Sequence, residues 1–127
     1  MMINFTLNIY SGIKQLFIIL TSIFCIVNIG YAQLHKVSWY GGSFHGKKTA
    51  NGETYNMNAM TAASNTHKMG TKLLVTNPKN NKSVIVKVND TGGFAKYGRT
   101  LDLSKGAFAK IADLNSGTCN VTIKILK

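Results

Sequence analysis

Cysteine, proline and acidic side chains are all scarce in this chain of 127 residues. It has two cysteines, Cys25 and Cys119, one proline, and four acidic residues against 15 lysines and arginines. Cys25 lies in an apolar N-terminal run, so removal of that run would leave one cysteine and exclude a disulfide framework. The length allows one domain. That domain must therefore be held together by packing alone.

The first third of the chain differs from the rest. Residues 15–34 contain no charged side chain, and residues 16–29 are almost continuously apolar. Lys14 precedes this run, and Gly30-Tyr31-Ala32 follows it. These features predict a secretory signal peptide over residues 1–32, cleaved after Ala32, and an exported protein. The alternative is an uncleaved anchor, because the uncharged stretch approaches the ~20 residues that span a bilayer.

The charge balance of residues 33–127 favours an anionic partner. This part carries fourteen basic and four acidic side chains, a formal net charge of +10. Such an excess attracts polyanions over long range. The basic residues are scattered, and no nucleic-acid-binding motif lies among them, so we predict no nucleic acid partner. Outside the cytoplasm the remaining polyanions are wall polymers and the membrane surface, and weak membrane contact is one expectation. A generic solubilising charge is the alternative.

Short β-strands dominate the pattern after residue 32. Residues 36–40 alternate polar and apolar side chains, as a half-buried strand does. Residues 71–77 and 83–89 are rich in β-branched side chains and flank a turn that begins at Pro78, which predicts a hairpin. Residues 119–126 alternate again and predict a closing strand.

One short helix and one long loop complete the predicted elements. Ser104 is placed to cap the helix, and Gly117 is expected to end it. The apolar face of this helix is predicted to consist of Ala107, Phe108, Ile111 and Ala112. Residues 41–52 contain four glycines and predict a loop, where functional sites often lie.

Two of the four acidic residues lie in settings suited to chemistry. Glu53 follows Asn-Gly, and Asp90 ends a predicted strand before Thr-Gly-Gly. A carboxylic acid held beside apolar walls can protonate a leaving oxygen, which makes Asp90 the main catalytic candidate. An Asx turn is the structural alternative for Asp90. We expect Asp102, between two leucines, to have a capping or structural role, and Asp113 to be solvated on the polar side of the helix.

The histidines and Cys119 do not follow the spacing of a metal site. We predict no metal and no cofactor, and we interpret Cys119 as a buried structural thiol. The histidines are His35, His45 and His67. Four aromatic residues are candidates for stacking against sugar rings, namely Trp39, Tyr40, Phe44 and Tyr55. Core packing explains Trp39 and Tyr40 equally well.

An ordered series of motifs runs from about residue 36 to residue 126. Its members are Ser38-Trp39-Tyr40-Gly41, residues 44–53 (FHGKKTANGE), Thr61-Ala62-Ala63, Gly70-Thr71, Val75-Thr76-Asn77, Val88-Asn89-Asp90 and Leu101-Asp102-Leu103-Ser104. Together they resemble the rare lipoprotein A (RlpA-like) family. The resemblance implies a mainly β fold, a six-stranded double-psi β-barrel with one short helix, related to barwin and the expansins.

For bacterial members the resemblance also implies an endolytic peptidoglycan lytic transglycosylase. Such a lyase cleaves the bond between N-acetylmuramic acid and N-acetylglucosamine without water and leaves a 1,6-anhydro end. The implied partner is the peptidoglycan glycan strand, bound by a monomer in the periplasm or the extracellular cell wall. The alternative function is a non-catalytic, expansin-like module that binds cell-wall glycan. No feature of the sequence specifically predicts a third function, that of a secreted inhibitor or toxin.

The resemblance assigns roles to individual residues. Asp90 matches the barrel aspartate of the family's Asn-Asp-Arg-Gly-Pro motif, and Glu53 matches the acid of its Asn-Gly-Glu loop. These two are the predicted catalytic residues. The predicted substrate-binding residues are Trp39, Tyr40, Phe44, His45, Asn51, Tyr55 and Asn89.

The sequence departs from the family pattern at three places. Asn56 stands where active members have a second loop acid, and it cannot exchange a proton. Ser64 stands where a histidine usually follows Thr-Ala-Ala, and His67 is the candidate to replace that ring. The segment after Asp90 reads Thr91-Gly92-Gly93 in place of Arg-Gly-Pro.

Overall fold

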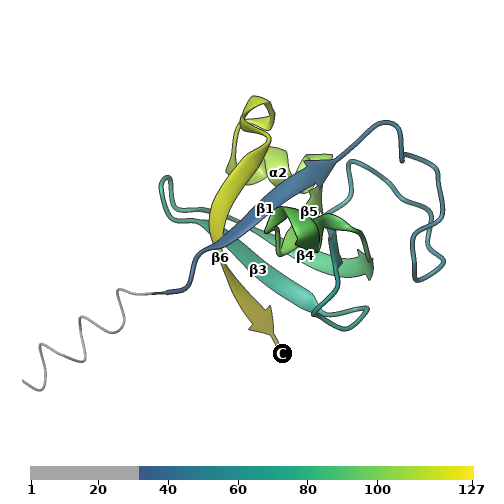
Figure 1. Cartoon of the computed structure of the whole chain (residues 1–127), viewed down its shortest axis with the longest axis horizontal. Helices are drawn as coiled ribbons and strands as arrows, with labels where there is room; N and C mark the ends of the chain where they lie inside the picture. The colour runs from purple at the N-terminus through teal and green to yellow at the C-terminus, as the bar shows by residue number, and fades with distance from the viewer. Residues whose placement is uncertain (1–31) are drawn as a thin grey trace, which may run out of the picture. The chain divides into compact units, whose positions relative to one another are not determined.

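In the computed structural model, which describes residues 32–127, the chain forms six strands closed into a barrel, with one α-helix and two 3-10 turns in this part (Figure 1). The strands are β1 (His35–Tyr40), β2 (Thr61–Ser64), β3 (Lys72–Asn77), β4 (Lys82–Asp90), β5 (Leu101–Ser104) and β6 (Thr118–Leu126). The helix is α2 (Lys105–Ile111), and the turns are η1 (Phe94–Tyr97) and η2 (Leu114–Ser116). Of the signal peptide predicted over residues 1–32, only Ala32 lies within the described residues. No helix within residues 32–127 is long and apolar enough to cross a membrane.

The strands follow the order β1-β5-β2-β4-β3-β6, and β6 pairs with β1 to close the barrel. The β1–β5 and β2–β4 pairs are parallel, and the other pairs are antiparallel. Closure gives each strand two neighbours and leaves no open sheet edge in the barrel. The predicted hairpin is confirmed as β3–β4, with Leu74 opposite Ile85.

A register shift in β2 determines what lies beside the end of β4. The β2–β4 pairing slips between Ala62 and Ala63, so that Ala63 pairs with Asp90. Such a bulge changes the direction of the strand and commonly occurs beside a functional site. Asp90 therefore ends β4 next to a residue with a small side chain.

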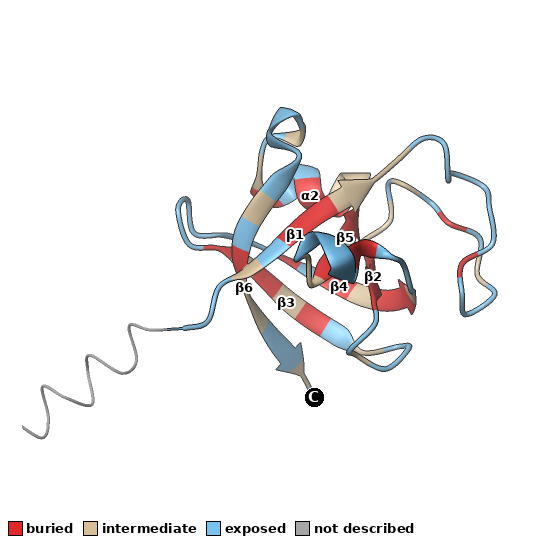
Figure 2. Cartoon of the chain, in the orientation of Figure 1, coloured by how far each residue is buried: buried red, intermediate tan, exposed pale blue. Residues whose placement is uncertain are grey.

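Figure 2 shows buried residues along the strands and on α2. The side chains of the core cluster come from the strands and from one face of α2 and fill the barrel interior. Its largest fully buried aliphatic and aromatic members are Val37, Leu73, Val75, Val86, Val88, Leu101, Leu103, Phe108, Ile111 and Val121. Each side chain of this size contributes about 1.5–3 kcal/mol when it leaves water. Burial declines along β6, since Val121 is fully buried whereas Ile125 is 55% exposed.

The helix begins as predicted and ends earlier than predicted. The Ser104 hydroxyl accepts a hydrogen bond from the Ala107 N–H at 3.1 Å, which caps the first turn. The helix ends at Ile111, not at Gly117, because the Asn77 and Asn80 side-chain amides donate to the Ile111 carbonyl oxygen at 2.8 and 3.0 Å. Gly117 instead closes η2 with a positive φ of 71°.

Two minor predictions need correction. Asp113 lies after the helix rather than on its polar side, and its carboxylate caps η2 by accepting from the Asn115 N–H at 2.9 Å. Cys119 is partly rather than fully buried, and burial raises the pKa of its thiol. Such a thiol is mostly protonated at neutral pH.

We predict that Ser104→Ala lowers the free energy of unfolding by about 1–2 kcal/mol. The substitution removes both the cap of α2 and the hydrogen bond from the Ser104 hydroxyl to the Ala59 carbonyl. Urea denaturation followed by circular dichroism measures the change. The matched control is Ser116→Ala at an exposed hydroxyl, with an expected change within about 0.5 kcal/mol. Equal effects of the two substitutions would contradict the capping role.

Candidate active site

The segment between β1 and β2 brings its tip against the end of β4. Lys48 and Thr54 form an isolated antiparallel bridge, and the Thr49 N–H donates to the Glu53 carbonyl at 2.8 Å. These contacts fold the segment into a narrow turn. At its tip the Ala50 N–H donates to Oδ1 of Asp90 at 2.9 Å. The loop predicted from the glycines is thus confirmed, and it reaches the predicted catalytic aspartate.

The two carboxylate oxygens of Asp90 have different surroundings. Oδ1 accepts two backbone N–H groups, from Ala50 and Thr91, each at 2.9 Å. Oδ2 accepts one hydrogen bond, from the Tyr40 hydroxyl at 3.3 Å. Because Oδ1 already faces two donors, a proton on this carboxyl group belongs on Oδ2. Oδ2 is therefore the less occupied of the two oxygens.

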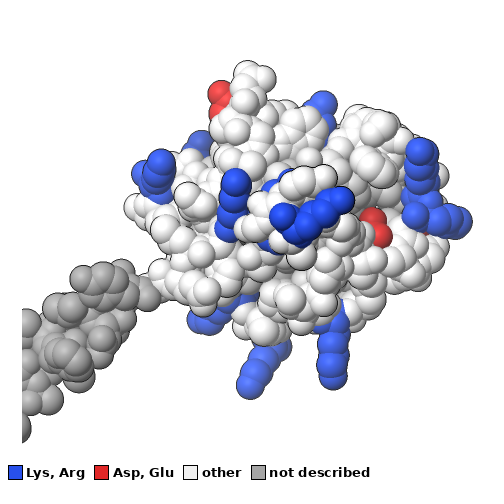
Figure 3. Space-filling model, viewed as in Figure 1, with Lys and Arg blue, Asp and Glu red and all other residues white. Residues whose placement is uncertain are grey.

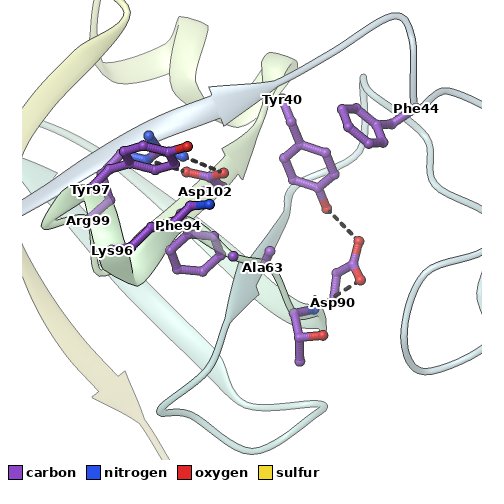
Figure 4. Close-up of a pocket in the computed structure, with 12 residues that line it drawn as sticks. Tyr40, Phe44, Ala63, Asp90, Phe94, Lys96, Tyr97, Arg99 and Asp102 are labelled. Atoms are coloured by element: carbon purple, nitrogen blue, oxygen red, sulfur yellow. Dashed lines mark hydrogen bonds and ion pairs between the residues drawn. The ribbon is translucent and has the colours of Figure 1, made fainter.

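Asp90 lines a hollow of about 510 Å³ at one end of the barrel (Figure 4). Tyr40 and Phe44 lie beside it on one side, and η1 with the residues that follow forms the opposite side. Ala63 lies between the two sides, next to Phe94 of η1 (Figure 4). The hollow is lined by Tyr40, Phe44, Ala63, Asp90, Thr91, Gly92, Gly93, Phe94, Lys96, Tyr97, Arg99 and Asp102.

Aromatic packing fixes the side of the hollow that holds Tyr40. The Tyr40 ring stacks on Tyr55, with 4.3 Å between ring centroids and 16° between planes, and meets Phe44 edge-on at 5.7 Å. Tyr55 is 2% exposed and donates its hydroxyl to the Tyr40 carbonyl oxygen. Burial, and then the Asp90 carboxylate, raise the pKa of Tyr40 far above its usual range. Tyr40 is therefore a hydrogen-bond donor to Asp90 at every physiological pH.

An ion pair stiffens the opposite side. The Arg99 guanidinium contacts the Asp102 carboxylate through Nε at 3.0 Å and through a terminal nitrogen at 3.3 Å. The Ser38 hydroxyl donates to Oδ1 of the same carboxylate. Asp102 thus has the structural role expected for it and does not cap the helix. Lys96 and Arg99 also lie over the Tyr97 ring, at 5.1 and 5.2 Å from its centroid.

Glu53 does not line the hollow that contains Asp90. Its carboxylate pairs with Lys87 Nζ at 2.8 Å and accepts from the Asn51 amide at 2.8 Å. The hydrogen bond from Lys87, followed by those from Asn51 and Asn89, lowers the pKa of Glu53. The group is ionised at neutral pH and cannot serve there as a proton donor. The structure does not bring the two predicted catalytic carboxylates into one pocket.

Of the predicted substrate-binding residues, only Tyr40 and Phe44 line the hollow. Asn51 and Asn89 both donate to Glu53, and Asn89 is buried. His45 accepts the Met57 N–H through Nδ1 at 3.1 Å. These contacts hold the loop in shape.

Trp39 packs against the core and donates its indole N–H to the Leu114 carbonyl at 3.2 Å. This arrangement matches the core-packing alternative for Trp39. Tyr55 lies beneath Tyr40 rather than on the surface of the hollow.

The positions that depart from the family pattern are tied into the structure by local hydrogen bonds. His67 does reach back to Ser64, with 3.0 Å between Nδ1 and Oγ, but His67 does not line the hollow. Asn65 holds the turn after Asp90 through two hydrogen bonds with the backbone of Gly92. Asn56 accepts the Asn58 N–H at 2.9 Å and stabilises the loop.

Sequence reasoning missed the side of the hollow that η1 supplies. Phe94, Lys96, Tyr97 and Arg99 follow the Gly92-Gly93 pair directly. An alternation of aromatic and basic residues just after a candidate catalytic residue was the available signal. Among the described residues, no group of three His, Cys, Asp or Glu side chains is arranged to hold a metal ion.

Residues 33–123 match the family model described as lytic transglycolase. The chain belongs to this family. It is 50% identical over 101 residues to the endolytic peptidoglycan transglycosylase RlpA of Campylobacter jejuni, and 50% identical over 94 residues to the protein of the same name from Neisseria meningitidis. The matches cover 80% and 74% of this chain but only 36% and 39% of those relatives.

Solved structures confirm the predicted double-psi β-barrel class. An expansin of Clavibacter michiganensis in complex with cellohexaose superposes with a TM-score of 0.61 at 23% identity, over 76% of this chain and 51% of that one. The Streptomyces papain inhibitor superposes with a TM-score of 0.59 at 25% identity, over 77% of this chain and 96% of that one. The predicted relation to expansins thus extends to the fold.

We predict that Lys87→Met raises the pKa of Glu53 toward its ordinary value, because the substitution removes the largest cause of its lowering. The folded-state pKa lies below the unfolded one, so the contact favours folding at neutral pH and this contribution is lost as the pH falls. NMR titration of the side-chain carboxyl carbons measures the shift. Lys82→Met, at the other end of β4, is the matched control. An unchanged Glu53 titration in Lys87→Met would contradict the ion pair.

Proposed function

We propose that this protein is an endolytic peptidoglycan lytic transglycosylase that cleaves the bond between N-acetylmuramic acid and N-acetylglucosamine. The observation that carries the proposal is the asymmetry of Asp90, which lines an open hollow and in which Oδ1 accepts two backbone N–H groups whereas Oδ2 accepts only the Tyr40 hydroxyl. Curated relatives named for the same activity share half of their aligned residues with this chain, which adds support.

One carboxyl group is sufficient for the reaction. Protonated Oδ2 of Asp90 gives its proton to the glycosidic oxygen as the bond from that oxygen to C1 of N-acetylmuramic acid breaks. The N-acetylglucosamine part leaves with a free hydroxyl group. The 6-hydroxyl oxygen of the same N-acetylmuramic acid then bonds to C1, and its proton returns to Oδ2. The product carries a 1,6-anhydro ring, no water is consumed, and the acid is restored.

The walls of the hollow suit a glycan. Phe44 is 49% exposed and Tyr97 is 60% exposed, so both rings are available to pack against sugar rings. Lys96 lies over Tyr97 and adds a positive charge on the same side. Basic side chains are spread over the face shown in Figure 3 rather than gathered in one patch, which suits a long anionic polymer.

The proposed activity places the protein outside the cytoplasm, at the periplasmic or extracellular cell wall. Residues 1–32 serve as the export signal in this proposal, and residues 33–127 form the working domain as a monomer. The family match over residues 33–123 supports this division of the chain.

A non-catalytic glycan-binding module is the second candidate. Glu53 is engaged by Lys87 outside the hollow, and Asp102 is neutralised by Arg99. Asn56 and Ser64 replace two groups that the family pattern supplies. Among the described residues, Asp90 is therefore the one carboxylate of the hollow that pairs with no basic side chain. A hollow with a single such carboxylate and without the family's other groups is the observation that favours the binding module.

We predict that the purified protein releases 1,6-anhydro products from peptidoglycan and that Asp90→Asn lowers the rate at least about 100-fold. An amide cannot transfer the proton, and acid–base catalysis of this kind is worth about 10²–10⁴ in rate. Mass spectrometry of the soluble products measures both. Sacculi and glycan strands stripped of their peptides, compared side by side, show which form is the substrate.

The matched control is Asp113→Asn, the same chemical change at an exposed carboxylate outside the hollow. This variant should keep the activity of the original protein. If no anhydro products form while the protein still sediments with sacculi, the binding module replaces the enzyme.

A further inference from the structure

One side-chain contact holds the proton-exchanging oxygen of Asp90. Among the described residues, only the Tyr40 hydroxyl donates to Oδ2. A carboxyl group rotates about a single soft torsion, so the direction of this oxygen depends on what holds it. The two N–H groups on Oδ1 fix one end of the carboxylate, and Tyr40 fixes the other.

Tyr40 is itself held firmly. Tyr55 covers one face of its ring, Phe44 meets it edge-on, and the Tyr55 hydroxyl bonds to the Tyr40 backbone. Each such aromatic pair contributes about 0.5–1.5 kcal/mol beyond the area it buries. Since Tyr40 ends β1, the ring direction is tied to the rigid barrel rather than to the loop alone.

The donor role of Tyr40 is also fixed. Burial first, and the nearby Asp90 carboxylate second, raise the pKa of this phenol, and Asp102 adds a smaller effect in the same direction. Lys96 and Arg99 line the same hollow, and Arg99 is paired with Asp102. The phenol therefore keeps its proton at every physiological pH.

We propose that Tyr40 is a positioning residue, whose hydroxyl holds Oδ2 of Asp90 in the direction from which it meets the glycosidic oxygen. This role goes beyond contact with the glycan, which the sequence predicted for Tyr40. Its kinetic part rests on the function proposed above. The 3.3 Å contact is longer than a typical O–H···O bond, and hydrogen bonds of catalytic groups are often long before substrate binds.

The first test measures the contact without any reaction. The ¹³C chemical shift of tyrosine Cζ, recorded at neutral pH on labelled protein, reports the hydrogen bond and the charge at each hydroxyl. Asp90→Asn removes the charged acceptor of the Tyr40 hydroxyl and should move the Tyr40 signal. Asp113→Asn is the matched control and should leave Tyr40 unchanged. An unchanged Tyr40 in Asp90→Asn would overturn the proposal.

The second test separates positioning from substrate binding. Tyr40→Phe keeps the ring and its stacking but removes the hydroxyl, so we expect kcat to fall about 10–100-fold and KM to stay within about threefold. Thr76→Val is the matched control, because it removes a hydroxyl that bonds Ser83 outside the hollow. Both constants should be unchanged in that variant.

The outcomes are distinct. A raised KM with unchanged kcat in Tyr40→Phe would reduce Tyr40 to a glycan contact and overturn the positioning role. Absence of anhydro products from the unaltered protein would remove the proposed function together with the kinetic role. The NMR chemical shift of Tyr40 would still decide whether Tyr40 holds Asp90.

Discussion

The pairing of β6 with β1 closes the barrel, and the candidate site depends on that closure. A domain of this size buries a modest core, and its single described cysteine, Cys119, is free. The closed ladder gives every strand two hydrogen-bonded neighbours, and α2 adds Phe108 and Ile111 to the interior. The end of β1 and the end of β4 are thereby held on one framework. Tyr40 and Asp90, the last residues of these two strands, consequently lie within hydrogen-bond distance.

The site combines this rigid framework with a loop whose own side chains are occupied in shaping it. Glu53, Asn51 and Asn89 bind one another and Lys87, which leaves them little freedom to bind a ligand. The result of that network is the placement of one peptide group, the Ala50 N–H, against Asp90. The loop acid thus acts on Asp90 indirectly, through the backbone that it helps to hold.

Local sequence signals predicted the elements whose stability is largely local. The β3–β4 hairpin has β-branched strands and a proline turn, and Ser104 caps α2 as expected. β2 (TAAS) and β5 (LDLS) carried no such signal, because each has four residues and forms only through partners distant in the sequence. The end of α2 was misjudged for a related reason, since amides from the distant hairpin terminate it.

The same distinction applies to the site. Asp90, which lines the hollow, was predicted from the sequence because its glycine-rich surroundings and its motif are local, and the motif series also included Tyr40. The separation of Glu53 from the hollow depends on Lys87, a partner 34 residues away. Arg99 was missed for a different reason, because its ion-pair partner Asp102 is only three residues away and the alternation of aromatic and basic residues after Asp90 was a local signal.

The hydrogen bonds to Oδ1 of Asp90 come from peptide groups of Ala50 and Thr91, not from side chains. Every amino acid except proline supplies such an N–H. Thr91 stands where the family usually has arginine, and its N–H still donates to Oδ1 of Asp90. The side chains at these two positions are free to vary in size and charge while the aspartate keeps its orientation. Substitutions next to Asp90 in the sequence or in space therefore need not disturb it.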